Sequence, residues 1–300
     1  MRMNETTRFE DAARIWLSVK QLEVKANTYA ESYERTVEKI LLPRMKNVTL
    51  GEIDREFTSK MFLELADHYS DSTLHKCQIV IDGIFNEAKY AGAELLPLPK
   101  IKIKSKIPPK VKCTYSAQEV ELIKDFAKLH RYGLSILLLI ELGLRCSEML
   151  ALSWDDIDFD LKSVKINKAC VAVKGGGLID APKSKSSIRE LPLSDAFCEY
   201  LSFYAKGRSG YIINNGKRLM TPANYTRNKY NKFFDDMAKE GAFSKRLSPH
   251  ELRHTCGTLF YEKTGDIYAV SKYLGHSSVA VTAKYYVHSD VELLRQRLKI

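Results

Sequence analysis

Apolar residues in the first hundred positions recur every three to four residues, which is the spacing of amphipathic helices. Thr28 and Glu31 form a capping-box pattern ahead of one such run, so we expect a helix to begin at Thr28. A second run spans residues 71–91, and its expected apolar face comprises Ile79, Ile81, Ile84, Phe85 and Ala88. The pattern predicts a small helical domain over residues 1–96.

Helical patterns return in residues 114–300, which we take as a second domain. Ser116 and Glu119 form another capping box, which predicts a helix start. Residues 134–142 are apolar on nearly all sides, so this helix should be buried. Gly143 then supplies the signal that ends it.

A short run of strands interrupts the helices of the second domain. Residues 164–173 and 188–193 favour strands, and a glycine turn at 175–177 lies between them. Helices resume at Ser194 and again at Thr221, where a proline follows the cap. The expected fold class is therefore mainly α with a small antiparallel β-sheet, an α+β arrangement.

Residues 97–113 form a basic linker between the two predicted domains. Its four prolines prevent a continuous helix, and residues 100–112 hold six lysines and no acidic residue. With a formal net charge of +10 for the chain, this composition favours a polyanion such as DNA as partner, although a plain spacer in a basic protein is the alternative. The lysines expected to follow the phosphates are Lys100, Lys102, Lys104 and Lys106.

The composition excludes several classes of protein. No apolar run is long enough to span a membrane, and the N-terminus lacks the apolar segment of a signal peptide. We therefore expect a cytoplasmic protein without a membrane partner. The six cysteines are scattered and contain no Cys-x-x-Cys pair, which argues against zinc sites. We expect neither a metal ion nor a cofactor.

A histidine and an arginine are predicted on one face at the start of a helix. Ser248 and Glu251 form a capping box, with Pro249 in the first helical position. His250 and Arg253 are three residues apart, so they should point the same way. The positive end of a helix dipole favours a phosphate there, although a surface pair without a ligand would show the same pattern.

Arg145 directly follows a turn between two predicted helices. Such a turn can fix the side chain, and a guanidinium matches two phosphate oxygens while keeping its charge. An ion pair with Glu148 or Asp155 is the alternative role for Arg145. This residue is therefore a second candidate for binding a phosphate.

Three further residue types complete a set suited to phosphate chemistry. Lys183 and Lys185 precede the strand at 188–193, where a lysine can donate a proton. His276 lies in a Leu-Gly-His-Ser segment, and Tyr285 follows nine residues later. A phenol with a pKa of about 10 needs nearby cations to become a nucleophile. The structural alternatives are a solvated turn, a capping histidine and a core tyrosine.

Taken together, these segments resemble the tyrosine recombinase family, also called the phage integrase family. The family order of Arg, Lys, His-x-x-Arg, His and Tyr is complete, and Gly-Leu-Arg-x-Ser-Glu and Leu-Gly-His-Ser-Ser are specific in combination. The resemblance is strong from about residue 114 to 290, and the first hundred residues resemble the family's helical core-DNA-binding domain. It implies a two-domain DNA clamp and a catalytic set of Arg145, Lys183, His250, Arg253, His276 and Tyr285.

The resemblance implies a site-specific recombinase or integrase that acts through a 3′-phosphotyrosyl intermediate, for integration and excision of a mobile element. In that scheme Tyr285 attacks, His250 accepts its proton and Lys183 donates to the leaving oxygen. The arginines and the second histidine bind the phosphate, so no metal ion is needed. The implied partners are double-stranded DNA with a specific core site, a homotetramer on that DNA, and accessory excision or bending proteins.

Several positions leave alternatives within this resemblance. Tyr286 is adjacent to Tyr285 and alone fits the family's Tyr-x-His pattern, so it stays the alternative nucleophile. Lys185 is the alternative to Lys183 and otherwise a DNA contact. We expect no arm-binding module before the core-binding domain. We also expect a helix at 290–300, whose apolar stripe docks on a neighbouring subunit or on its own domain.

Three other functions compete with recombination. A type IB topoisomerase-like enzyme would use the same chemistry to nick and reseal one duplex. A non-catalytic DNA-binding regulator would not need the tyrosine. A metal-dependent nuclease would need a carboxylate cluster, and Asp155, Asp156 and Asp158 form only a short run beyond a helix.

Overall fold

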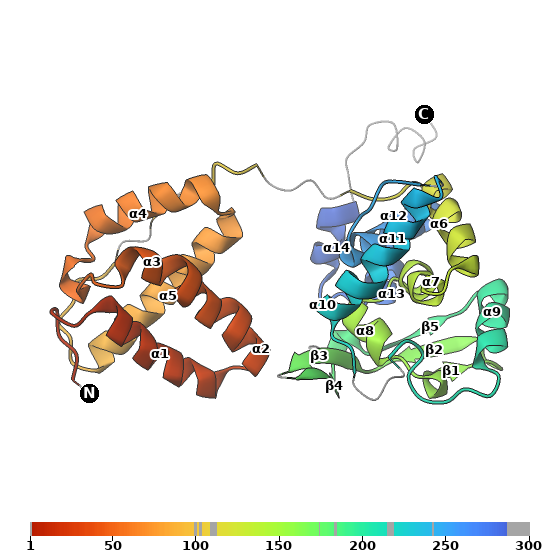
Figure 1. The fold of residues 1–300 in the computed structure, drawn as a ribbon, viewed down its shortest axis with the longest axis horizontal. Coiled ribbons are helices and arrows are strands. Elements are labelled where there is room, and N and C mark those ends of the chain that lie inside the picture. Colours follow the sequence, from red (N-terminus) through yellow and green to blue (C-terminus); the bar gives the residue numbers. More distant parts are fainter. Residues whose placement is uncertain are drawn as a thin grey trace. The chain divides into compact units, whose positions relative to one another are not determined.

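The computed structural model of this 300-residue chain describes residues 2–98, 101, 104–108, 113–173, 175–182, 185–214, 219–241 and 243–286. The side chains of residues 185, 281 and 284–286 lie outside this description, as does the helix expected at 290–300. The chain divides into two compact units, Met1–Val111 and Lys112–Ile300, whose elements are labelled in Figure 1. Each unit has its own hydrophobic core.

The first unit is helical, and its amphipathic faces turn toward a shared core. Phe9, Trp16, Leu65 and Ile81 belong to that core, and none of them is more than 3% exposed. Two π-helical segments, Tyr29–Glu34 and Val37–Leu41, lie between the second and third helices. The α-helices are α1 (Phe9–Glu23), α2 (Ala26–Thr28), α3 (Leu42–Met45), α4 (Arg55–His68) and α5 (Asp71–Tyr90).

Two details predicted for these helices are wrong. The helix begins at Ala26 rather than Thr28, because the backbone leaves the extended conformation at Lys25, and Thr28 already has φ −67° and ψ −40°. Ile79 is 46% exposed, whereas the other four residues predicted for its face are buried. Ile79 is two residues from Ile81, and a separation of two places side chains on different faces of a helix.

The described part of the basic linker is anchored on the first unit. The Ser105 hydroxyl donates to the carbonyl oxygen of Tyr69 at 2.7 Å, and its amide donates to the Asp71 carboxylate at 2.6 Å. The following amide donates to the carbonyl oxygen of Ala66 at 2.9 Å. These bonds satisfy polar groups where α4 ends and α5 begins, and they hold the linker there.

The linker lysines differ in their surroundings. The ammonium of Lys106 lies 2.7 Å from the Asp67 carboxylate, and both side chains are largely exposed. Lys104 is exposed, and Lys100 and Lys102 lie outside the described residues. An ammonium has three donors, so the exposed Lys106 could contact a phosphate beside its Asp67 partner.

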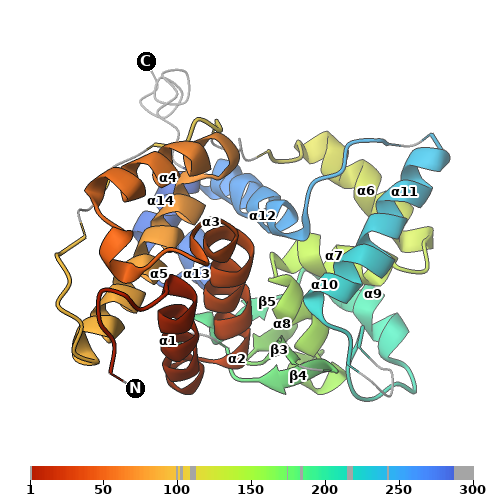
Figure 2. The ribbon, with the colours of Figure 1, turned by 60° about the vertical axis from the view of Figure 1, so that its left-hand side comes forward.

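The second unit combines helices with strands that gather along one of its edges, as Figures 1 and 2 show. Helix α7 is buried on nearly all sides, as its apolar sequence predicted. The helices are α6 (Ala117–Leu129), α7 (Gly133–Leu142), α8 (Cys146–Ala151), α9 (Asp195–Ala205), α10 (Pro222–Tyr225), α11 (Asn231–Lys239), α12 (Pro249–Thr264), α13 (Ile267–Leu274) and α14 (Val279–Tyr286).

Within the described part of the second unit, the strands form two small antiparallel sheets, with orders β1-β2-β5 and β3-β4. The single strand predicted at 164–173 is wrong, because residues 167 and 168 leave the first ladder and the chain then pairs in the other sheet. Gly176 and Gly177 belong to β4, so only the start of the predicted glycine turn is a turn. The strands are β1 (Ile157–Asp158), β2 (Ser163–Ile166), β3 (Ala169–Val173), β4 (Gly176–Asp180) and β5 (Arg189–Pro192).

Local capping explains where the functional helices start. The Ser116 hydroxyl accepts from the Glu119 amide at 3.2 Å, and the Ser248 hydroxyl accepts from the Glu251 amide at 3.3 Å. Both bonds confirm the predicted capping boxes. Among the described residues, no helix has the length and apolar character needed to cross a membrane.

Candidate active site

Arg145 lies where the chain leaves α7 and enters α8. Gly143 ends α7 with φ +56°, and a Cβ on it would lie 2.7 Å from the Leu274 side chain. Leu144 is fully buried and anchors the turn. Arg145 is then the N-cap of α8, with φ −68° and ψ 147°. Its guanidinium therefore extends from a backbone position that is held on both sides.

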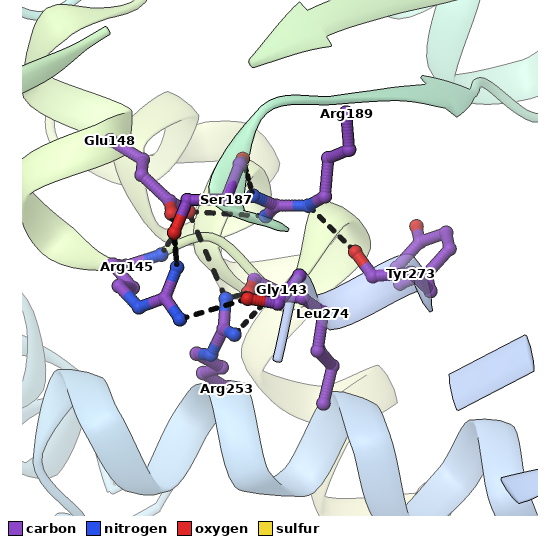
Figure 3. A network of polar contacts seen from close by, with 9 residues as sticks. Gly143, Arg145, Glu148, Ser187, Arg189, Arg253, Tyr273 and Leu274 are labelled. Atoms are coloured by element: carbon purple, nitrogen blue, oxygen red, sulfur yellow. Dashed lines mark hydrogen bonds and ion pairs between the residues drawn. The ribbon is translucent and has the colours of Figure 1, made fainter. Parts of the chain in front are cut away.

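The carboxylate of Glu148 gathers three guanidinium groups, as Figure 3 shows. Arg145 donates from Nη1 to Oε1 at 2.5 Å, and its backbone amide donates to Oε2 at 2.9 Å. Arg189 donates from Nη2 to Oε2 at 3.1 Å, and Nη1 of Arg253 lies 3.8 Å from the same oxygen. The Glu148 side chain is 2% exposed, so these charges meet in a site largely closed to water.

Three consecutive carbonyl groups at the end of α13 bind the same three arginines. The carbonyl end of a helix carries partial negative charge and attracts cations. Each guanidinium is thereby fixed relative to the other two. The donors and acceptors are Arg189 Nε with the Tyr273 oxygen at 2.7 Å, Arg253 Nη2 with the Leu274 oxygen, and Arg145 Nη2 with the Gly275 oxygen at 3.2 Å.

The cluster keeps an excess of two positive charges, since three guanidiniums meet one carboxylate. Burial raises the pKa of the Glu148 carboxyl, but Arg189, followed by Arg253 and Arg145, outweighs burial and holds that pKa below its ordinary value. The carboxylate therefore stays ionised and orients the guanidiniums. A phosphodiester carries one negative charge and its five-coordinate transition state carries two, so the excess favours the transition state.

Helix α12 directs Arg253 inward and His250 outward. Arg253 is 1% exposed and donates from Nη1 to the carbonyl oxygen of Gly143 at 2.7 Å, which ties α12 to the end of α7. His250 is exposed in the first turn of the helix. Its ring lies 4.6 Å from the His254 ring, edge to face. The two residues predicted to share a face therefore differ in burial.

His276 follows the three carbonyls at the end of α13. Its Nδ1 lies 2.8 Å from the hydroxyl oxygen of Thr282 in α14. Burial lowers the pKa of His276 to about 4, and the charges of Arg253 and Arg145 add to this effect. The imidazole is therefore neutral at physiological pH, with one nitrogen that donates and one that accepts.

The remaining candidates lie partly outside the description. Tyr285 and Tyr286 fall in the last turn of α14, which packs against α12 and α13, but their side chains are not described. Lys185 begins a 3-10 turn over Lys185–Ser187 and its side chain is likewise not described, while Lys183 lies outside the described residues. The structure thus brings together Arg145, Arg253 and the backbone that leads to His276.

The sequence of this region also matches a family model. The phage integrase family model matches residues 114–292, more than half of the chain and all of the arginine cluster. The chain belongs to the phage integrase family.

Several named relatives match parts of this phage integrase family member. The XerC-like tyrosine recombinase of Caldanaerobacter subterraneus is 29% identical over 63% of this chain and 52% of its own length. The ICEBs1 integrase of Bacillus subtilis is 24% identical over 96% of this chain and 80% of its own. The transposase of transposon Tn916 from Enterococcus faecalis is 26% identical over 63% and 51%. The chain therefore spans about half the length of the first and third relatives.

Solved structures of similar proteins share the fold. The Tn1549 transposon integrase in complex with transposon right end DNA superposes with a TM-score of 0.78, at 18% identity, over 98% of this chain and 99% of that one. The XerH site-specific recombinase bound to palindromic difH substrate gives 0.70 at 17% identity, over 100% and 99%. These likenesses confirm the mainly helical fold with small antiparallel sheets.

Sequence reasoning missed Arg189 in this phage integrase family member and considered Glu148 only as an alternative partner of Arg145. Leu191 and Leu193 are 2% and 7% exposed. Alternation along an extended segment places Arg189 on the same face as both leucines. An arginine on a buried face needs a buried partner of opposite charge. That alternation was a signal for a buried Arg189, but it does not identify Glu148 as the partner.

Proposed function

We propose that this chain cuts and rejoins double-stranded DNA at a specific core site through a 3′-phosphotyrosyl intermediate, as a recombinase for integration and excision of a mobile element. The observation that carries the proposal is the carboxylate shared by Arg145 and Arg253, which makes two phosphate-binding side chains part of one rigid cluster. The names of the relatives, which are recombinases, integrases and transposases, support the same reaction class.

In the proposed reaction Tyr285 attacks phosphorus in line with the 5′-oxygen. The phenolic proton passes to His250 while the new phosphorus–oxygen bond forms. The bond to the 5′-oxygen breaks, and Lys183 supplies the proton that makes a free 5′-hydroxyl. The tyrosine ester conserves the bond energy, so a 5′-hydroxyl from a second duplex reverses the step. Tyr286 and Lys185 remain the alternatives for nucleophile and acid.

The phosphate itself is held by fixed donors. Arg145 and Arg253 bind the non-bridging oxygens, and neutral His276 donates one ring N–H. Preorganised donors of this kind stabilise developing charge without reorganising during the reaction. Two guanidiniums thereby take the place that divalent ions occupy in metal nucleases. We therefore expect the reaction to need no metal ion.

Each part of the chain has a proposed role on the DNA. Residues 1–96 act as the core-DNA-binding domain, residues 97–113 as a basic strap along phosphates, and residues 114–300 as the catalytic domain. The strap lysines are Lys100, Lys102, Lys104 and Lys106, with Lys185 as a further contact. Strand exchange between two duplexes needs four active subunits, so the working form is a homotetramer on DNA, assisted by accessory excision or bending proteins.

Trapping the covalent complex tests this function directly. A duplex nicked near the cleavage site loses the short 5′-hydroxyl fragment, so that the ester accumulates and the labelled peptide can be sequenced. The proposal expects a DNA-linked peptide that contains Tyr285, formed equally well in EDTA. A reaction that stops in EDTA would instead favour a metal-dependent nuclease. Absence of any adduct from DNA that the protein binds would favour a non-catalytic regulator.

The products distinguish recombination from topoisomerase-like nicking and resealing. A recombinase given two core sites yields recombinant joints. Relaxed plasmid without such joints would support the topoisomerase alternative, because both enzymes share the tyrosine ester.

Replacing Arg145 with alanine should slow cleavage by about 10²–10³-fold, the usual effect of removing one preorganised donor. Its side chain is 35% exposed, which leaves it accessible to a phosphate. Single-turnover cleavage of nicked DNA gives the rate. Arg131→Ala is the control, because this arginine lies over the Tyr132 ring away from the cluster, with 4.6 Å between the guanidinium carbon and the ring centre. Equal cleavage rates for the two variants would show that Arg145 does not bind the phosphate.

A further inference from the structure

Arg189 connects three separate parts of the second unit through one buried guanidinium. It begins β5, and its side chain is 6% exposed. Nε donates to the Tyr273 carbonyl at the end of α13, and Nη2 donates to Glu148 in α8. Nη1 donates at 3.0 Å to the carbonyl oxygen of Ser187, in the turn before β5. Every acceptor belongs to a different element, so Arg189 fixes their mutual distances.

The Ser187 acceptor closely follows residues 183–185, which carry the two candidate lysines and are called the lysine segment below. Ser187 closes the 3-10 turn that Lys185 begins, and it is 4% exposed. Its hydroxyl oxygen also lies 3.3 Å from Nη1 of Arg145. The turn passes close to the end of α13, since a Cβ on Gly275 would lie 3.1 Å from the Ser186 carbonyl oxygen. Arg189 and Arg145 therefore both bind Ser187, the residue that links the lysine segment to the arginine cluster.

Only an arginine can make this connection with a single side chain. The planar guanidinium presents donors in several fixed directions, whereas a lysine ammonium is a compact charge on a flexible stem. A lysine here could keep its charge beside Glu148, but it could not span the Tyr273 and Ser187 carbonyls at the same time.

We propose that Arg189 is a positioning residue for the proton donor. It holds the base of the lysine segment, at Ser187, at a set distance from the arginine cluster, so that a lysine ammonium at 183 or 185 reaches the leaving 5′-oxygen. Arg189 does not touch the substrate. The proposal rests on the function proposed above, in which this lysine gives its proton to the 5′-oxygen and becomes a neutral amine.

Changing the leaving group separates an effect on proton donation from an effect on phosphate binding. When sulfur replaces the bridging 5′-oxygen, the leaving thiolate needs no proton, because a thiol has a pKa of about 8.5. The experiment measures single-turnover cleavage of nicked DNA containing oxygen or sulfur at that position, for wild type, Arg189→Lys and Arg189→Gln. Arg246→Lys is the matched control, because this arginine pairs only at the surface with Asp235, at 2.6 Å, among the contacts described.

Both Arg189 variants should cleave the oxygen substrate about 10- to 100-fold more slowly than wild type, since displacing a catalytic group by about 1 Å costs up to 10²-fold. On the sulfur substrate Arg189→Lys, which keeps the positive charge of the cluster, should come within about threefold of wild type. Each preparation cleaves both substrates, so a misfolded fraction cancels in the ratio of the two rates. Arg246→Lys should behave as wild type on both.

Two results would overturn the positioning role. An equal loss on both substrates would mean that Arg189 acts through the phosphate-binding arginines or through stability alone. An unchanged rate on the oxygen substrate would mean that the lysine segment needs no such anchor. If the wild-type protein cleaves neither substrate, the proposed function itself fails, and this result is distinct because it does not depend on the variants.

Discussion

Tyr285→Phe should abolish the covalent DNA adduct while leaving DNA binding nearly intact. The phenolic oxygen is the atom that bonds to phosphorus in the proposed reaction, and phenylalanine keeps the ring without it. Removing a covalent nucleophile lowers the rate by at least about 10⁴-fold. One lost neutral hydrogen bond is worth about 0.5–1.5 kcal/mol, so the dissociation constant for DNA should rise by no more than about tenfold. Adduct formation on nicked DNA and a binding titration measure the two effects.

Tyr286→Phe is the matched control, because it removes the same atom one residue away in the same last turn of α14. Thr282 is fully buried and contacts His276, and in any helix the positions three and four residues beyond a given residue are both its neighbours. Helix geometry alone therefore does not choose between the two tyrosines, and the choice of Tyr285 follows from the spacing to His276. An adduct that persists in Tyr285→Phe and disappears in Tyr286→Phe would reassign the nucleophile.

Local sequence signals were enough to place the ends of the functional helices. A capping box needs only two residues that are three apart, and a glycine stop needs only one residue with positive φ. The starts at Ser116 and Ser248 and the end at Gly143 were predicted for this reason, and the structure confirms them. These signals put Arg145 and Arg253 in the correct local positions.

Pairings between distant segments were harder to predict, because they depend on the packed fold. Arg189 and Glu148 are 41 residues apart and meet only after β5 has packed beside α8 and α13. The division of one predicted strand into β2 and β3 also depends on the packed fold, because local propensity does not determine which strand each segment pairs with. The conjunction of motifs predicted the reaction class, whereas the support around the arginines became visible only in the structure.

Glu148→Gln should lower the free energy of unfolding of the second unit by about 3–5 kcal/mol, the cost of leaving buried charges without their partner. Glutamine keeps the shape but removes the negative charge that three buried or half-buried arginines share. The loss corresponds to a fall in Tm of roughly 6–20 °C for a unit of this size. Trp154 lies in the second core and Trp16 in the first, so fluorescence in a Trp16→Phe background follows the second unit alone.

Glu121→Gln is the control for this experiment. Glu121 pairs with Lys124 at 3.2 Å with its side chain 65% exposed, so its replacement should cost less than about 1 kcal/mol. A Glu148→Gln variant as stable as Glu121→Gln would show that the carboxylate does not hold the arginines together. Loss of cleavage activity without loss of stability would instead restrict Glu148 to orienting Arg145.

Protonation of the Glu148 carboxylate should account for part of the stability that the protein loses at low pH. The folded-state pKa of Glu148 lies below its ordinary value of 4.5, because the attraction of Arg189, Arg253 and Arg145 outweighs the opposing effect of burial. Its stabilising contribution is therefore complete above the ordinary value and is lost as the pH falls through the folded-state pKa. Glutamine has no proton to gain, so the unfolding free energies of wild type and Glu148→Gln should converge below about pH 4.5. Urea unfolding at a series of pH values measures this, and curves that stay parallel on acidification would exclude an ionised Glu148 at the centre of the cluster.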